Sequence, residues 1–147
     1  MTDLELPLQG RPLPLVDEVN RPFFEGAARG VLRFQRCNDT GRLQHYPRPR
    51  SVYTGGEVTW VEVSGAGVVY SFRVIRQNQG APAFQANTPY IVALIDLNEG
   101  VRMMGNVIAG PGAGVRIGMA VRAAFYCIDP EASLHLPFWI PSDIAGA

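Results

Sequence analysis

The chain has 147 residues, 47% of them hydrophobic and 18% charged, and its 13 acidic and 13 basic residues cancel. A chain of this length and composition can form a folded core without disulfides, and its neutral balance gives it no long-range attraction for nucleic acid or an anionic membrane surface. Every basic residue is an arginine, which excludes a Schiff-base lysine and a P-loop lysine.

The two cysteines, Cys37 and Cys127, are too few and too far apart to indicate a disulfide framework, and no signal-peptide pattern opens the chain. The longest apolar run, residues 90–95, is much shorter than the ~20 residues of a membrane-crossing helix. We therefore expect a cytoplasmic protein that does not span a membrane.

Residues 1–16 contain three prolines and scattered leucines, a composition typical of an irregular arm. The leucines of such an arm either line a partner's groove or pack on the arm's own domain. A helical pattern then covers residues 17–29, where Asp17 suits the N-cap, Pro22 falls in the first turn and Gly30 suits the stop.

Turn signals divide the rest of the chain into short β segments. Residues 31–35 and 43–46 form a small predicted hairpin around a turn at 38–41. A loose loop is expected over 77–88, and another at 110–114. Five longer strands are predicted, at 58–63, 68–74, 89–97, 101–108 and 120–128, with the first two joined as a hairpin by the Gly65-Ala66-Gly67 turn.

Five short strands with glycine corners suit a small closed barrel of the OB type. The predicted fold class is therefore mainly β: a five-stranded OB-fold barrel preceded by an N-terminal helix and a small metal-free ribbon-like hairpin. We expect an irregular N-terminal arm at 1–16, the helix and a degenerate ribbon region at 17–56, and the OB-fold domain at 57–147.

The segment around Cys37 resembles a rubredoxin-like zinc ribbon that has lost its ligands. Ribbons of this kind carry a Cys-x-x-Cys-Gly motif, a Tyr/Phe-Pro-Arg stretch and a Cys-Pro-x-Cys-Gly motif. The four ligand positions here hold Cys37, Thr40, Ser51 and Thr54. Structural zinc requires four strong nitrogen or sulfur donors, and hydroxyl groups are poor substitutes, so we expect no zinc.

Further fragments match the same family in order along residues 17–140, at 22–26, 63–71, 89–94, 99–102 and 115–119. With the ribbon, they resemble the acyl-CoA-associated OB-fold family with an N-terminal rubredoxin-like zinc ribbon, catalogued as domain of unknown function thirty-five. The resemblance implies a non-catalytic accessory subunit in a hetero-oligomer with a thiolase-like enzyme, a thiolase-type aldolase or an acyl-CoA hydratase. It also implies a role in holding the CoA thioester, with acyl-CoA as a shared ligand and no tightly bound cofactor.

The ribbon region concentrates positive charge. Between residues 33 and 50 five arginines face a single acidic residue, Asp39. Arginine binds phosphate bidentately, so these side chains are candidates for binding CoA or an acidic partner surface, although a solvated face would look the same. The candidate binding residues are Arg36, Arg42, Arg48 and Arg50 in the ribbon, with Phe84 and Tyr90 for the partner or the pantetheine arm.

No catalytic constellation is apparent. Cys127 and the two histidines, His45 and His135, are not arranged in a recognisable triad order, and Asp96 and Glu99 flank a hairpin tip where acidic residues are good turn formers. We therefore predict no catalysis by this chain. A free-standing acyltransferase or thioesterase would need Cys127 as its nucleophile.

An OB barrel can also bind single-stranded nucleic acid by stacking bases on aromatic strand residues. Tyr70, Phe72 and Arg73 could supply such a surface. However, Tyr70 and Phe72 alternate in phase with Val68 and Val74, which predicts that they fill the barrel. This observation and the neutral charge favour an accessory protein over the nucleic-acid alternative.

Overall fold

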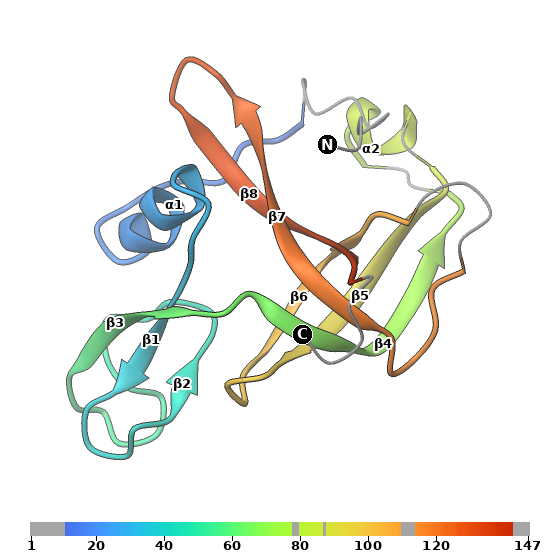
Figure 1. The fold of residues 1–147 in the computed structure, drawn as a ribbon. Helices are drawn as coiled ribbons and strands as arrows, with labels where there is room; N and C mark the ends of the chain where they lie inside the picture. Colours follow the sequence, from blue (N-terminus) through green and yellow to red (C-terminus); the bar gives the residue numbers. More distant parts are fainter. Residues whose placement is uncertain (1–10, 78–79, 87, 110–113, 143–147) are drawn as a thin grey trace.

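The computed structural model describes residues 11–77, 80–86, 88–109 and 114–142 (Figure 1). Helix α1 (Arg21–Ala28) precedes a three-stranded sheet in the order β2–β1–β3, and the later strands close a barrel in the order β4–β5–β6–β8–β7. The sheet comprises β1 (Leu32–Cys37), β2 (Leu43–Gln44) and β3 (Val58–Val63). The barrel comprises β4 (Ala66–Ile75), β5 (Tyr90–Leu97), β6 (Arg102–Val107), β7 (Ala120–Asp129) and β8 (Leu134–Pro141), with helix α2 (Pro82–Ala86) between β4 and β5.

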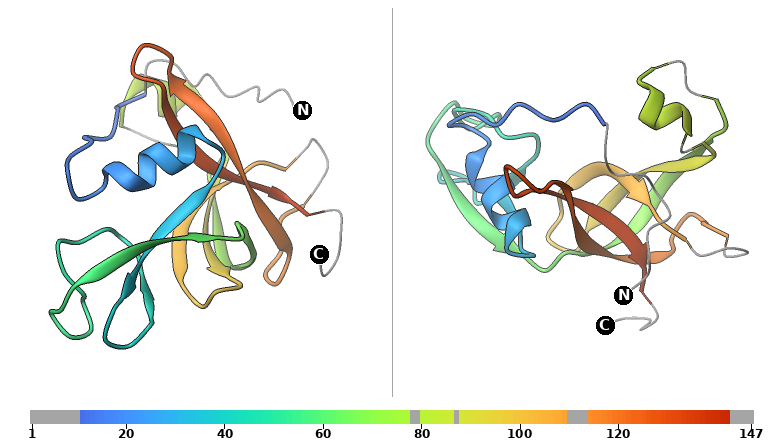
Figure 2. Two further views of the ribbon diagram at one scale, coloured as in Figure 1. Left: turned by 60° about the vertical axis from the view of Figure 1, so that its left-hand side comes forward. Right: turned by 90° about the horizontal axis from the view of Figure 1, so that it is seen from above.

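The predicted mainly β fold, with a five-stranded OB barrel behind a helix and a small ribbon sheet, is confirmed. Two further views show α1 and the three-stranded sheet on one side of the barrel and α2 away from them (Figure 2). The described part of the predicted arm, residues 11–16, contains no helix or strand. Residues 1–10 and most of the predicted 110–114 loop lie outside the described residues.

Helix α1 begins at Arg21, later than predicted. Asp17 is not its N-cap, because the Asp17 carboxylate accepts hydrogen bonds from the Val19 and Asn20 amides (2.9 Å each) and so forms the turn before the helix. Pro22 does lie in the first turn, and Gly30, with φ +75°, ends the helix as predicted.

The predicted hairpin between 58–63 and 68–74 is wrong, because β3 pairs with β1 and leads into the barrel at a bend. Gly65 makes the bend with φ +74°, and Ala66 and Gly67 already belong to β4. The Ser64 amide before the bend donates to Glu99 Oε2 (2.8 Å) at the tip of the β5–β6 hairpin. The ribbon sheet and the barrel are therefore joined through β3 and β4, and the smaller predicted pairing of β1 with β2 is confirmed.

The fifth barrel strand is β8, which the sequence analysis missed. Its apolar residues Leu134, Leu136, Phe138 and Ile140 alternate, but the strand also contains prolines at 137 and 141. A proline removes a ladder hydrogen bond and argues against a central strand. The prolines are tolerated in β8 because only one side of this strand is paired along its length, with β7. On the other side, the described pairing with β6 is a single parallel one, Val107 with Trp139.

Tyr70 and Phe72 do not fill the barrel, so that prediction is wrong. Val69 is buried at 1% exposed, whereas Val68, Tyr70 and Phe72 are 40%, 49% and 36% exposed. Because side chains alternate along a strand with period two, Val68, Tyr70 and Phe72 share the outward face of β4, and Gly67 and Val69 face the core. The strand irregularity between Val69 and Ser71 comes after Val68, so it is not the cause of this outward face. The predicted loose loop at 77–88 likewise contains the short helix α2.

One hydrophobic core joins the barrel to the helix and the ribbon sheet. Ala93, Ile95 and Leu97 alternate inward along β5, as a strand with one buried face requires. Phe23 of α1 and Phe34 of β1 belong to the same cluster of buried side chains. The ribbon therefore packs directly on the barrel.

Among the described residues, no helix is long and apolar enough to cross a membrane.

Candidate functional site

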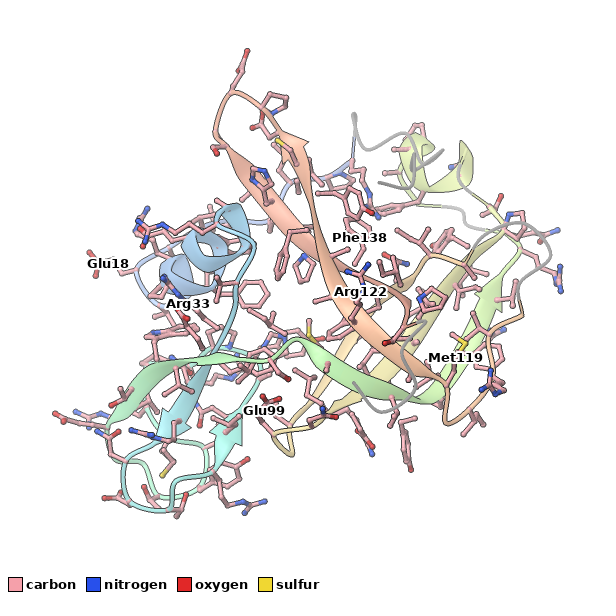
Figure 3. All side chains as sticks on the ribbon, in the orientation of Figure 1. Glu18, Arg33, Glu99, Met119, Arg122 and Phe138 are labelled. Carbon is pink, nitrogen blue, oxygen red and sulfur yellow. The ribbon has the colours of Figure 1, made fainter. Side chains whose placement is uncertain are left out.

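A groove of about 510 Å³ lies where β6 and β8 diverge. Its walls come from α1, the loop after β2, strands β6 and β8, and Arg11 of the segment before α1. It is therefore formed jointly by the helix, the ribbon and the barrel. Phe138, labelled in Figure 3, lies on β8 and contributes to the apolar part of the wall. The larger aliphatic and phenylalanine side chains of the lining include Phe23, Phe24, Met103, Met104, Leu136 and Phe138.

The groove is close to the barrel core at Gly105 on β6. The side chain of Trp139, 0% exposed, takes the space that a residue larger than glycine would need. The Nε1 atom of Trp139 is buried and has no hydrogen-bond partner among the residues that the structure describes. Trp139 therefore packs behind the groove wall at Gly105.

Arg11 brings a positive charge to the groove. The guanidinium carbon lies 4.9 Å from the ring centroid of Phe84 and 5.5 Å from that of Phe138, within range of cation–π attraction. Partial burial lowers the pKa of Arg11 from its usual value, and Nη1 is buried without a partner in the described part of the chain. Sequence reasoning missed Arg11 because it is a lone charge in a proline-rich segment.

His45 contributes a neutral imidazole to the same groove. Its ring lies among aromatic rings, with centroid distances of 4.4 Å to Tyr46, 5.0 Å to Phe34 and 5.6 Å to Phe23. Burial lowers the pKa of His45 to about 4, so the ring is uncharged at neutral pH. Its Nδ1 atom has no hydrogen-bond partner among the described residues.

The structure brings the six predicted binding residues together only in part. Arg48 lines the groove, while Phe84 and Tyr90, with ring centroids 6.4 Å apart, lie with Arg11. Arg42 stacks on Tyr53, with its guanidinium carbon 4.1 Å from the ring centroid. Arg36, Arg42 and Arg50 are exposed residues of the ribbon that do not line the groove.

The four degenerate ligand positions, which we call the knuckle cluster (Cys37, Thr40, Ser51 and Thr54), do come together. Cys37 Sγ lies 3.7 Å from Thr54 Oγ1, and hydrogen bonding to Ser51 and Thr40 lowers the pKa of the Cys37 thiol to about 6. The donor set does not fit structural zinc, because it offers one thiol and three hydroxyls. Moreover, Thr54 donates its hydroxyl hydrogen to Asp39 Oδ2 (2.6 Å).

The acidic side chains at the β5–β6 hairpin, Asp96 and Glu99, form hydrogen bonds with other residues of the protein. Asp96 forms a bidentate pair with Arg102 (2.6 and 3.1 Å), and this hydrogen bonding lowers the pKa of Asp96. Glu99, labelled in Figure 3, reaches Ser64 at the junction of ribbon and barrel. Both carboxylates therefore have structural partners.

Cys127 and His135 are cross-strand neighbours on β7 and β8, which their sequence separation did not reveal. The described structure places no hydrogen bond between them. Instead, the His135 Nδ1 atom lies 3.0 Å from the Ser133 carbonyl oxygen. A nucleophile needs a base within hydrogen-bond reach, so this pair is not an assembled catalytic dyad.

Two family models match the chain. The model described as "ChsH2, rubredoxin-like zinc ribbon domain" matches residues 24–50, and the one described as "ChsH2, C-terminal OB-fold domain" matches residues 60–126. A solved chain titled "Ltp2-ChsH2(DUF35) aldolase" is 35% identical, with a TM-score of 0.74 over 88% of this chain and 98% of that one.

Two curated relatives are similar over most of this chain. The "Probable enoyl-CoA hydratase alpha subunit" of Thermomonospora curvata is 36% identical over 134 residues, which is 90% of this chain and 40% of the relative. The "3-oxo-4,17-pregnadiene-20-carboxyl-CoA hydratase alpha subunit" of Mycobacterium tuberculosis is 40% identical over 125 residues, 82% of this chain and 37% of the relative. This chain thus spans about two fifths of the length of these two relatives. From its ribbon, its barrel and these matches, the chain belongs to the ChsH2 (DUF35) family of OB-fold proteins with a rubredoxin-like zinc-ribbon domain.

Proposed function

We propose that this chain is a non-catalytic accessory subunit that binds and supports an acyl-CoA enzyme, either a hydratase or a thiolase-type aldolase. The names of its relatives support this function, because two are subunits of CoA hydratases and one solved relative comes from an aldolase. The absence of an assembled nucleophile and base among the described residues supports a non-catalytic role. The partner then contributes the bond-making groups, in a hetero-oligomer.

The groove is the proposed place where the chain helps to hold the CoA thioester. This is carried by one observation: an apolar groove contains Arg11 and Arg48, neither of which has a carboxylate ion pair among the described residues. CoA combines phosphate groups with a long, weakly polar pantetheine arm, and arginine is well suited to binding phosphate. Phe84 and Tyr90, beside Arg11, would contact the pantetheine arm or the partner. Arg36, Arg42 and Arg50 would extend the positive surface outside the groove.

Co-purification tests the accessory role. A tagged chain recovered from its source organism should bring down a hydratase or a thiolase-like enzyme, and repeated recovery of the chain alone would refute the proposal. Calorimetric titration of the recovered complex tests CoA binding. Arg48→Ala should weaken binding, whereas Arg116→Ala, an exposed arginine that does not line the groove, should not. Equal effects of the two substitutions would indicate only a solvated positive face.

Two other functions, acyl-CoA turnover by this chain and nucleic-acid binding, can be distinguished from the accessory role by experiment. If the isolated chain turned over acyl-CoA and Cys127→Ala abolished the turnover, the non-catalytic assignment would fail. The exposure of Tyr70 and Phe72 favours the nucleic-acid alternative more than the sequence suggested. Against it, Arg102 covers the Tyr70 ring at 3.5 Å and is itself paired with Asp96. A fluorescence titration with single-stranded oligonucleotides at low salt should show no saturable binding.

We also propose that the ribbon holds no structural zinc. The chemistry of the knuckle cluster supports this, since three of its four donors are hydroxyls. Metal analysis of the purified protein should find less zinc than one ion per chain, and treatment with EDTA should leave its Tm unchanged.

A further inference from the structure

Two glutamines are buried in the ribbon sheet. Gln35 of β1 and Gln44 of β2 are 2% and 4% exposed and lie opposite each other. Gln44 Nε2 donates to Gln35 Oε1 at 2.8 Å. We call this pair the glutamine clamp. A buried amide is costly unless its donors and acceptors are bonded, so the pair needs partners on its other side.

Those partners are main-chain groups of the loop over residues 48–52. Gln35 Oε1 accepts from the Arg48 amide and Gln35 Nε2 donates to the Arg48 carbonyl, both at 2.8 Å. Gln44 Oε1 accepts from the Val52 amide at 2.9 Å, and Gln44 Nε2 donates to the Arg50 carbonyl at 3.2 Å. Both side chains are therefore satisfied, and both hold the same loop against β1 and β2.

The clamped loop leads directly into the second half of the knuckle cluster. Ser51 Oγ accepts from the amides of Tyr53 and Thr54 (3.1 and 3.2 Å), which shapes the turn. The 3.7 Å between Cys37 Sγ and Thr54 Oγ1 is close to the edge of a ZnS₄ tetrahedron, about 3.8 Å for Zn–S bonds of about 2.3 Å. The two halves of the ribbon are thus held at a metal-site spacing by hydrogen bonds.

We propose that the glutamine clamp performs the structural role that zinc would have in this ribbon, and that it positions Arg48 at the groove. This inference rests on the metal-free ribbon proposed above. A zinc ion would link the two knuckles through four ligand bonds. The clamp links the neighbouring segments through four part-buried hydrogen bonds to the main chain and one buried hydrogen bond within the pair. Gln35 bonds both the amide and the carbonyl of Arg48, so the clamp fixes the position of the Arg48 backbone from which the side chain extends.

Hydrogen exchange on the full chain in EDTA tests the clamp without a mutation. The Arg48 and Val52 amides should be strongly protected, although they belong to a loop, because their acceptors are buried side chains. Exchange at the rate of an unprotected loop amide would overturn the proposal.

Substitution of Gln35 by methionine keeps the length of the side chain but removes its hydrogen bonds to Arg48. With the part-buried Arg48 amide left unpaired, Tm should fall by about 2–12 °C. Affinity for CoA should fall as it does for Arg48→Ala. Gln77→Met, at an exposed glutamine just after β4, is the matched control and should change neither quantity. An unchanged Tm for Gln35→Met would refute the clamp, and an unchanged CoA affinity would refute the positioning of Arg48.

Restoring the missing ligands gives a second test. The triple substitution Thr40→Cys, Ser51→Cys and Thr54→Cys should bind Co²⁺ with thiolate-to-metal absorption bands. In the Gln35→Met background, zinc bound to this triple variant should recover most of the lost Tm. Failure to bind metal would refute the metal-like spacing. A lower Tm of the natural chain in EDTA would instead refute the metal-free ribbon. The hydrogen-exchange experiment would then still test the clamp.

Discussion

Replacing Gly105 with alanine tests the packing beneath the groove. A Cβ atom at this position would lie 2.6 Å from Trp139 Cδ1 and 2.7 Å from Nε1, well inside van der Waals contact. Trp139 is 0% exposed, so its ring has no solvent-filled space into which it could move. Either the ring or strand β6 must shift.

The cost follows from two opposing terms. Overpacking a well-packed core costs about 1–3 kcal/mol. The smaller conformational freedom of alanine in the unfolded chain offsets about 0.4–1 kcal/mol of that cost. With the middle of each range, the free energy of unfolding should fall by about 1.3 kcal/mol, which for a domain of this size lowers Tm by about 3–5 °C.

Thermal unfolding followed by circular dichroism measures the effect. Gly114→Ala is the matched control, because no described atom lies within 4 Å of the position that its Cβ would take. Trp139→Phe, which removes Nε1 and leaves a smaller ring, should reduce the cost of Gly105→Ala when the two are combined. If Gly105→Ala had the same effect in both backgrounds, or none, the steric explanation would be refuted.

Two further predictions concern titratable groups. The pKa of His45 is about 4 in the folded protein and 6.5 ordinarily, so the unfolded chain binds more protons between these values and stability falls as the pH drops from 7 towards 4, by at most about 3 kcal/mol. Measured as Tm against pH, this loss should be smaller in His45→Phe, and His135→Phe should retain it. Asp96→Asn removes the half-exposed pair with Arg102 and should lower Tm only slightly, with an effect that disappears in high salt. A large, salt-independent loss would show that the pair is part of the core packing.

The resemblance to a zinc ribbon located the knuckle cluster, but the sequence did not reveal the groove. The spacing of the knuckle cluster was readable because each half is a local turn motif. The roles of Arg11 and the glutamine clamp could not be predicted in this way. A lone arginine in an irregular segment and a glutamine on a strand carry no local signal of burial. Their roles depend on Phe138 of β8 and on the loop at 48–52, which are distant in sequence or irregular in structure.

The sequence by itself determined the class of each local element: strands where apolar residues alternate, a helix with Pro22 in its first turn and Gly30 at its end, and a ribbon whose ligand positions hold hydroxyls. These features are encoded within a few residues. Tertiary structure decided the pairing of β3 with β1, the recruitment of β8 as fifth barrel strand and the outward position of Tyr70. Strand partners are chosen by long-range packing and register, so a short stretch of sequence is compatible with several of them until the whole core is assembled.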